Sequence, residues 1–169
     1  ASVGIEILKS GGNAIDAAIA MNAVLCIAEP HMTGVGGDCF VMLSVDGSTN
    51  IKALNGSGKS SSKAKASKLR KRNLSVITPE MPEAITIPGA VAAWGLLHKD
   101  HGYMPWQELF GPAINYAQHG IKVHERVAMD WSKNIQKLSS DLDTSKLFLK
   151  NDKSFEFMDN FKNENLSET

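Results

Sequence analysis

The sequence has little cysteine, no excess of either charge and no apolar run long enough to span a membrane. Cys26 and Cys39 are its only cysteines, which is too few for a disulfide framework, so we expect both to be buried thiols. Basic and acidic residues both number 18, so no overall charge attracts the chain to nucleic acid or to an anionic membrane. We find no signal-peptide pattern and no transmembrane run, and these features leave the compartment open. Hydrophobic residues make up 43% of the 169 residues, which is enough for a core.

The clearest element is an apolar segment over residues 14–28. Only Asp16 and Asn22 are polar within it, and a helix that is apolar nearly all round belongs in a protein interior. Asn13 is a suitable N-cap, with Asp16 near the positive end of the helix. Pro30 ends the segment. We therefore predict a buried helix over residues 14–28.

A β-hairpin is predicted after this helix, and the helix is expected to pack against it. Residues 40–45 and 51–54 form two apolar runs, and the turn signal Asp46-Gly47-Ser48 separates them. The first run is almost continuously hydrophobic, which predicts a strand that is buried on both faces. Beyond Ser139 the chain is polar and weakly patterned. Further helices are predicted over residues 2–9, 89–99, 106–119 and 124–138.

This order of elements indicates an α/β fold with α+β layering. Two strands are too few for a stable sheet, so we expect residues 1–169 to form a single incomplete domain. The chain also starts without Met inside a helical pattern, and residues 165–169 resemble the opening of a helix. Both features favour a fragment of a longer protein.

Two glycine-containing motifs invite a catalytic or binding interpretation. The run Gly34-Val35-Gly36-Gly37 fits neither the Walker pattern nor the dinucleotide fingerprint and precedes a strand, which favours a structural turn. Gly56-Ser57-Gly58 suggests a nucleophilic serine, but a nucleophile elbow has glycines two residues away on either side and a helix after it. A structural turn is the favoured interpretation here as well.

Two further patterns favour surface roles. Residues 59–72 are rich in serine, lysine and arginine, but they lack the aromatic side chains that stack on bases, so a solvated surface is favoured over a nucleic-acid partner. Four histidines have no Glu or Cys at a matching ligand spacing, so we predict no metal. These histidines are His98, His101, His119 and His124.

Several motifs resemble, in order, the signature of the γ-glutamyltranspeptidase family. The resemblance runs from Ala1 to about Val127. The motifs are Gly11-Gly12-Asn13-Ala14-Ile15-Asp16-Ala17-Ala18, Glu29-Pro30-His31, Gly34-Val35-Gly36-Gly37-Asp38-Cys39-Phe40, Ile87-Pro88-Gly89-Ala90-Val91, Met104-Pro105-Trp106 and Pro112-Ala113-Ile114.

The resemblance implies the αββα sandwich of the N-terminal nucleophile hydrolases. In that family a precursor cuts itself into a large and a small subunit. The new N-terminal Thr of the small subunit is the nucleophile, its α-amine is the base, and an acyl-enzyme passes the γ-glutamyl group to water or to an amino acid. Glutathione is among the family's substrates.

This chain resembles only the N-terminal part of the large subunit, so the resemblance assigns it no catalytic residue and no cofactor. We expect it to be inactive alone. Its expected partners are the small-subunit portion of the same precursor and a small-molecule amide substrate.

One loop departs from the family pattern. Family transpeptidases typically have Asp-Phe-Arg-Glu after the hairpin, with the Arg binding the substrate α-carboxylate, whereas this chain has Asn55-Gly56-Ser57-Gly58. Ser57 donates one neutral hydrogen bond and cannot clamp a carboxylate as Arg does. We take Ser57, Asn55 and Lys59 as candidate substrate-binding residues.

Three functions stay open from the sequence. The first is γ-glutamyl transfer or glutathione hydrolysis. The second is a divergent amidohydrolase or acylase, similar to cephalosporin acylases or oxamate amidohydrolases, without specificity for γ-glutamyl groups. The third is a non-catalytic scaffold domain that kept the sandwich.

Overall fold

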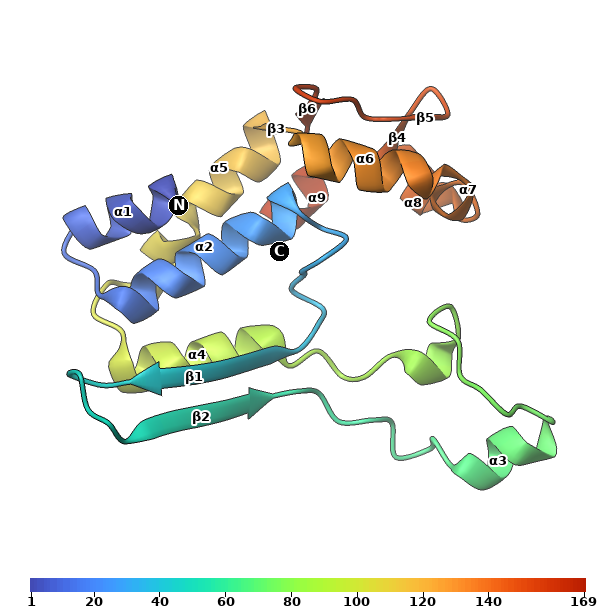
Figure 1. Ribbon diagram of the computed structural model, residues 1–169, viewed down its shortest axis with the longest axis horizontal. Coiled ribbons are helices and arrows are strands. Elements are labelled where there is room, and N and C mark those ends of the chain that lie inside the picture. Colours follow the sequence, from blue (N-terminus) through green and yellow to red (C-terminus); the bar gives the residue numbers. More distant parts are fainter. The chain divides into compact units, whose positions relative to one another are not determined.

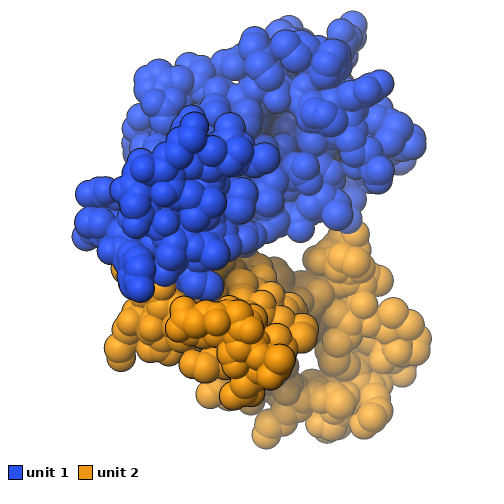
Figure 2. Space-filling model, turned by 60° about the vertical axis from the view of Figure 1, so that its left-hand side comes forward, with its two compact units in different colours: residues 1–34, 102–169 blue, residues 35–101 orange.

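The computed structural model describes all of residues 1–169 and divides into two compact units, coloured separately in Figure 2. Unit 1 combines residues 1–34 with residues 102–169, and unit 2 is residues 35–101. The division into units does not test the expectation that residues 1–169 form a single incomplete domain, which stays a prediction.

Unit 1 is built around helix α2, which packs against α1, η2 and α5 (Figure 1). Its buried side chains are small or branched, and Ile19 and Ala20 are almost fully enclosed. The elements of unit 1 are α1 (Ser2–Lys9), α2 (Ala14–Ala28), η2 (Trp106–Phe110), α5 (Gly111–His119), β3 (Ile121–Lys122), α6 (Glu125–Lys133), α7 (Ile135–Leu138), α8 (Leu142–Phe148), β4 (Leu149–Lys150), β5 (Lys153–Ser154), β6 (Asn160–Phe161) and α9 (Glu164–Ser167).

Helix α2 has the predicted bounds and a complete capping box at its N-terminus. The Asn13 side chain accepts hydrogen bonds from the backbone N–H groups of Ile15 and Asp16, at 2.9 and 3.0 Å. The Asp16 carboxylate accepts in return from the N–H of Asn13 at 2.9 Å. This reciprocal pairing satisfies donors that the first turn of a helix leaves without partners.

An aromatic cluster forms the second part of the core of unit 1. The Trp131 ring lies 5.4, 5.7 and 5.1 Å from the rings of Phe148, Phe155 and Phe161, all in edge-on geometry. Residues beyond 139 are therefore more structured than their polar pattern indicated. The helix predicted over residues 124–138 is divided at Asn134 into α6 and α7.

Unit 2 contains one antiparallel hairpin and helix α4, which packs on both strands. The register runs from Cys39 opposite Gly56 to Ser44 opposite Ile51. Asp46 and Gly47 both have positive φ, at 53° and 70°, as a tight hairpin turn requires. The elements are β1 (Cys39–Ser44), β2 (Ile51–Gly56), α3 (Ala66–Lys71), η1 (Pro82–Ala84) and α4 (Ala90–His101).

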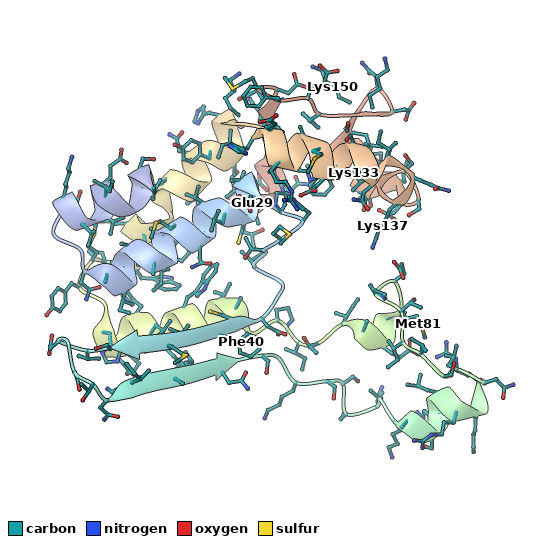
Figure 3. The ribbon with its side chains drawn as sticks, viewed as in Figure 1. Glu29, Phe40, Met81, Lys133, Lys137 and Lys150 are labelled. Carbon is teal, nitrogen blue, oxygen red and sulfur yellow. The ribbon has the colours of Figure 1, made fainter.

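The prediction that the first strand is buried on both faces is wrong for these residues. Phe40 and Met42 are 70% and 78% exposed, whereas Val41 and Leu43, which alternate with them, are half-buried. Phe40 is labelled in Figure 3. Only one face of the hairpin is covered within unit 2, because α4 packs on the side where Gly56 approaches Ala93. The packing of α2 on the hairpin stays a prediction.

The two cysteines differ in burial. Cys26 is buried, as predicted, and desolvation raises the pKa of its thiol against a smaller opposing hydrogen bond from the Thr33 side chain. Cys39 is only half-buried, and burial likewise raises the pKa of its thiol, with an opposing hydrogen bond from Trp94. Neither cysteine forms a disulfide. No helix has the length and apolar character needed to cross a membrane.

Candidate functional site

The three candidate substrate-binding residues lie in residues 55–59, which comprise the last two residues of β2 and the start of the loop after it and which we call the substrate loop. Asn55, Ser57 and Lys59 are all exposed. The Asn55 side-chain oxygen accepts a hydrogen bond from the N–H of Ser57 at 2.9 Å. Asparagine often forms such a turn with the residue two positions on, and here the bond fixes how the loop leaves the strand.

Two other segments of unit 2 hold the substrate loop in place. The N–H of Gly58 donates to the Asp38 carboxylate at 2.9 Å, from the residue just before β1. The N–H of Ile87 donates to the carbonyl of Lys59 at 3.0 Å. The loop is thus held on one side by the glycine-rich turn and on the other by the segment that leads into α4.

The glycines allow these segments to approach closely. A Cβ atom on Gly58 would lie 1.6 Å from the carbonyl oxygen of Ile87, and one on Gly89 would lie 2.2 Å from the carbonyl oxygen of Gly56. Both separations are far below van der Waals contact, so a larger residue would displace backbone. The carbonyl of Gly37 also accepts from the N–H groups at the start of α4, at 3.1 Å from Gly89 and 3.0 Å from the next residue.

Three motifs that are distant in the sequence therefore meet at one place. They are the glycine-rich turn that ends at Asp38, the substrate loop and the Ile87-Pro88-Gly89 segment. Sequence reasoning selected the loop residues but missed Asp38 and Ile87 as its anchors. Both residues lie in motifs of the family resemblance, but their hydrogen bonds to the loop depend on the tertiary fold.

The substrate loop offers polar contacts and no complete catalytic set. It presents a hydroxyl, an amide and an ammonium group to solvent, from Ser57, Asn55 and Lys59. No hydrogen bond joins the Ser57 hydroxyl to a histidine, and the next helix, α3, begins only at Ala66. No group of three or more His, Cys, Asp or Glu side chains is placed to hold a metal ion. The loop can therefore bind a polar or anionic group, but the residues around it supply no nucleophile and base pair.

The family described as Gamma-glutamyltranspeptidase matches the chain over residues 1–169. The chain belongs to the γ-glutamyltranspeptidase family. It is 36% identical over 150 residues to the glutathione hydrolase-like YwrD proenzyme of Bacillus subtilis (strain 168), a match that covers 89% of this chain and 28% of that relative. The family match also extends beyond Val127, where the recognised motifs weaken.

Solved structures agree with this assignment. The γ-glutamyltranspeptidase of Helicobacter pylori superposes with a TM-score of 0.89 at 26% identity, covering 99% of this chain and 49% of that one. The cephalosporin acylase of Bacillus halodurans superposes with a TM-score of 0.88 at 29% identity, covering 97% of this chain and 32% of that one. The α/β fold class is thus confirmed, as part of the N-terminal nucleophile hydrolase fold, and the chain spans only a fraction of each relative.

Proposed function

We propose that a longer protein containing this chain cleaves amides by acyl transfer, and that the substrate loop binds the acyl part of the substrate. The observation that carries the proposal is the family match along the whole chain, together with a loop that two other motifs hold in position. In this proposal residues 1–169 belong to the large-subunit region, and the small-subunit portion of the same precursor is their partner.

The nucleophile in this proposal is an N-terminal Thr outside residues 1–169. Its hydroxyl attacks the amide carbon while its α-amine takes the proton, and the amine leaving group departs with a proton returned from that base. Water or an amino acid then releases the acyl group. Residues 1–169 position substrate, since none of them forms a nucleophile and base pair, and we expect this part of the protein to be inactive alone.

Ser57 favours the divergent amidohydrolase or acylase alternative within this chemistry. An uncharged hydroxyl in the substrate loop cannot replace the bidentate contact that Arg makes with an α-carboxylate. The preference for γ-glutamyl compounds should therefore be weak.

Lys59 supports the opposing alternative of ordinary glutathione hydrolysis. Its carbonyl is tied to Ile87, so its position relative to Ser57 is set by the anchored loop, and its ammonium is exposed. A cation there, or one from the small subunit, would restore the missing charge.

The deciding experiment compares the full-length protein with its Ser57→Arg variant on two anilides. One carries a γ-glutamyl group, and the other an acyl group without the α-carboxylate. A charged hydrogen bond contributes about 1.5–3 kcal/mol, so the variant should gain roughly 10- to 100-fold in kcat/KM on the γ-glutamyl substrate alone. Ser62→Arg, at an exposed serine outside the loop, is the matched control.

Three outcomes separate the functions. A wild-type protein that already strongly prefers the γ-glutamyl anilide, with no gain from Ser57→Arg, would indicate a standard transpeptidase. Turnover of both anilides with a gain confined to Ser57→Arg supports the divergent enzyme. If the full-length protein turns over neither anilide, the non-catalytic scaffold is the better description.

A further inference from the structure

The most strongly charged part of the chain is the segment of residues 59–72, which we call the basic segment. Its seven basic residues have no acidic residue among them, although the chain as a whole has a formal net charge of +0. The net positive charge of this segment is therefore balanced by an equal net negative charge elsewhere. Such blocks of like charge commonly serve as interaction surfaces. The basic residues are Lys59, Lys63, Lys65, Lys68, Arg70, Lys71 and Arg72.

The charges of the basic segment are exposed and mostly unpaired. Every residue of the segment is exposed except Leu69, which is half-buried, and α3 within it has no buried residue. Arg72 pairs with Glu83, and the other six cations form no ion pair in the structure. The repulsion among them is thus unrelieved by the chain itself, which favours an external anionic partner.

The basic segment is the first part of a long excursion of the chain, residues 60–86, whose two flanking residues are hydrogen-bonded to each other. Residues 60–86 leave and rejoin the body of unit 2 where the carbonyl of Lys59 accepts from the N–H of Ile87. Figure 1 shows the chain running out from β2 to α3 and returning to α4. An arm held at both ends presents its charges at less conformational cost than a free tail.

The side chains of the excursion favour a lipid surface over a nucleic acid. No aromatic residue occurs in residues 59–86, so bases find no stacking partner. Exposed aliphatic side chains follow the cations instead, with Val76 68%, Ile77 44% and Ile85 70% exposed. Clustered lysines beside exposed aliphatic groups are typical of proteins that bind an anionic bilayer surface.

From these observations we infer that the basic segment, with Val76 and Ile77, is a docking surface for an anionic membrane. The cations lie in the headgroup region and the aliphatic side chains contact the acyl boundary. The binding is peripheral and does not depend on the amide chemistry proposed above.

Co-sedimentation of the full-length protein with lipid vesicles tests this inference. The vesicles contain phosphatidylcholine with 30% phosphatidylglycerol, or phosphatidylcholine alone. Lys65→Gln/Lys68→Gln is compared with Lys52→Gln/Lys99→Gln, which removes the same charge from exposed lysines elsewhere in unit 2. Each basic side chain near an anionic surface contributes about fivefold to partitioning, so the first variant should bind roughly 10- to 30-fold more weakly. The control should bind as the wild type does.

The remaining measurements distinguish lipid from other polyanions. Binding should weaken between about 0.1 and 1 M salt, as the screening length falls from roughly 10 to 3 Å. Val76→Ser/Ile77→Ser should weaken vesicle binding and leave any binding to double-stranded DNA unchanged. The inference is overturned if the anionic vesicles are not bound, if both lysine variants behave alike, or if DNA is bound more tightly than vesicles.

Discussion

Asp16 is the only polar or charged side chain in the fully buried core. Its carboxylate accepts hydrogen bonds from the backbone N–H groups of Asn13, Tyr103 and Met104 at 2.9 to 3.2 Å. It therefore joins the start of α2 to the turn that leads into η2. A buried carboxylate with three donors is costly to remove, because all three part-buried N–H groups lose their partner at once.

We predict that Asp16→Ala lowers the free energy of unfolding by roughly 2–4 kcal/mol, since it leaves three part-buried N–H groups without their acceptor. Asp16→Asn keeps one acceptor oxygen and should cost less. Urea unfolding of the full-length protein measures both. Asp46→Asn, in an exposed turn, is the control. If this control lost as much unfolding free energy as Asp16→Ala, the stabilising role of the Asp16 hydrogen bonds would be contradicted.

Asp130 provides a pH-dependent contribution to stability. The Arg126 side chain donates to its carboxylate at 2.8 Å, and His31 lies 3.4 Å away. The hydrogen bond from Arg126 is the largest cause that lowers the pKa of Asp130, with smaller contributions from its charge and from His31, against some desolvation. A carboxyl group whose folded pKa is depressed stabilises the fold above its unfolded pKa, about 3.9, and this contribution is lost as pH falls through the folded value.

We therefore predict that Asp130→Asn is less stable than the wild type at pH 7. The difference in stability should disappear as the pH falls toward 3 and the wild-type carboxylate becomes protonated. Melting temperatures of both proteins between pH 7 and pH 3 measure it. Asp143→Asn, whose parent side chain is 93% exposed, should show a smaller difference. A difference for Asp130→Asn that grows as the pH falls would show that the charged carboxylate does not stabilise the fold.

Among the elements, the substrate loop and the start of α4 depend on close backbone contact. Gly89 lies where a Cβ atom would meet the carbonyl of Gly56, whereas a Cβ atom on Gly36 would meet nothing within 4 Å. Both glycines belong to motifs that carry the family resemblance. Only the fold distinguishes the glycine that the packing requires from the one that it does not.

Gly89→Ala should displace the substrate loop and reduce kcat/KM of the full-length enzyme by roughly 10-fold or more, as expected for small misplacements of binding groups. Gly36→Ala should leave it nearly unchanged. Steady-state kinetics on the acyl anilide described above gives both values. Equal losses in the two variants would show that the contact at Gly89 does not position the loop.

Element boundaries were predicted well where local signals were strong. The capping pair Asn13 and Asp16 located α2 to the residue, and the Asp46-Gly47 turn located the hairpin with strand ends within two residues. The helix predicted over residues 106–119 instead begins with η2 and continues as α5 from Gly111. Within α1, Leu8 is 50% exposed although it is apolar, while Gly4 is buried.

At the scale of the whole molecule, much apolar surface has no partner within residues 1–169. The hairpin is a two-stranded sheet whose outer strand edges are unpaired, and Phe40, Met42 and Ile51 are at least half exposed on one face. Exposed strand edges and apolar faces promote association between chains. The chain also spans only 28% of the length of its Bacillus subtilis relative.

We predict that residues 1–169 expressed alone are marginally stable or aggregate. Chemical denaturation with light scattering measures this. A monomeric chain with a cooperative transition of about 5–15 kcal/mol, typical of intact domains, would show that no further part of the protein is needed for stability. Phe40→Ser/Met42→Ser should reduce aggregation without altering the helical signal, because both side chains already lie in solvent.

The sequence by itself determined the elements with local causes and the family. Helix capping, turn formation and hydrophobic periodicity each depend on a few neighbouring residues. The sequence therefore indicates them directly, at Asn13, at Asp46 and in the apolar run of residues 14–28. Only the tertiary structure decided which surfaces are buried and which motifs meet. Phe40 is exposed although its strand is apolar, and Asp38 holds a loop twenty positions further along the chain. Burial and long-range hydrogen bonds depend on which residues pack against a given residue. A local sequence pattern does not identify those neighbours.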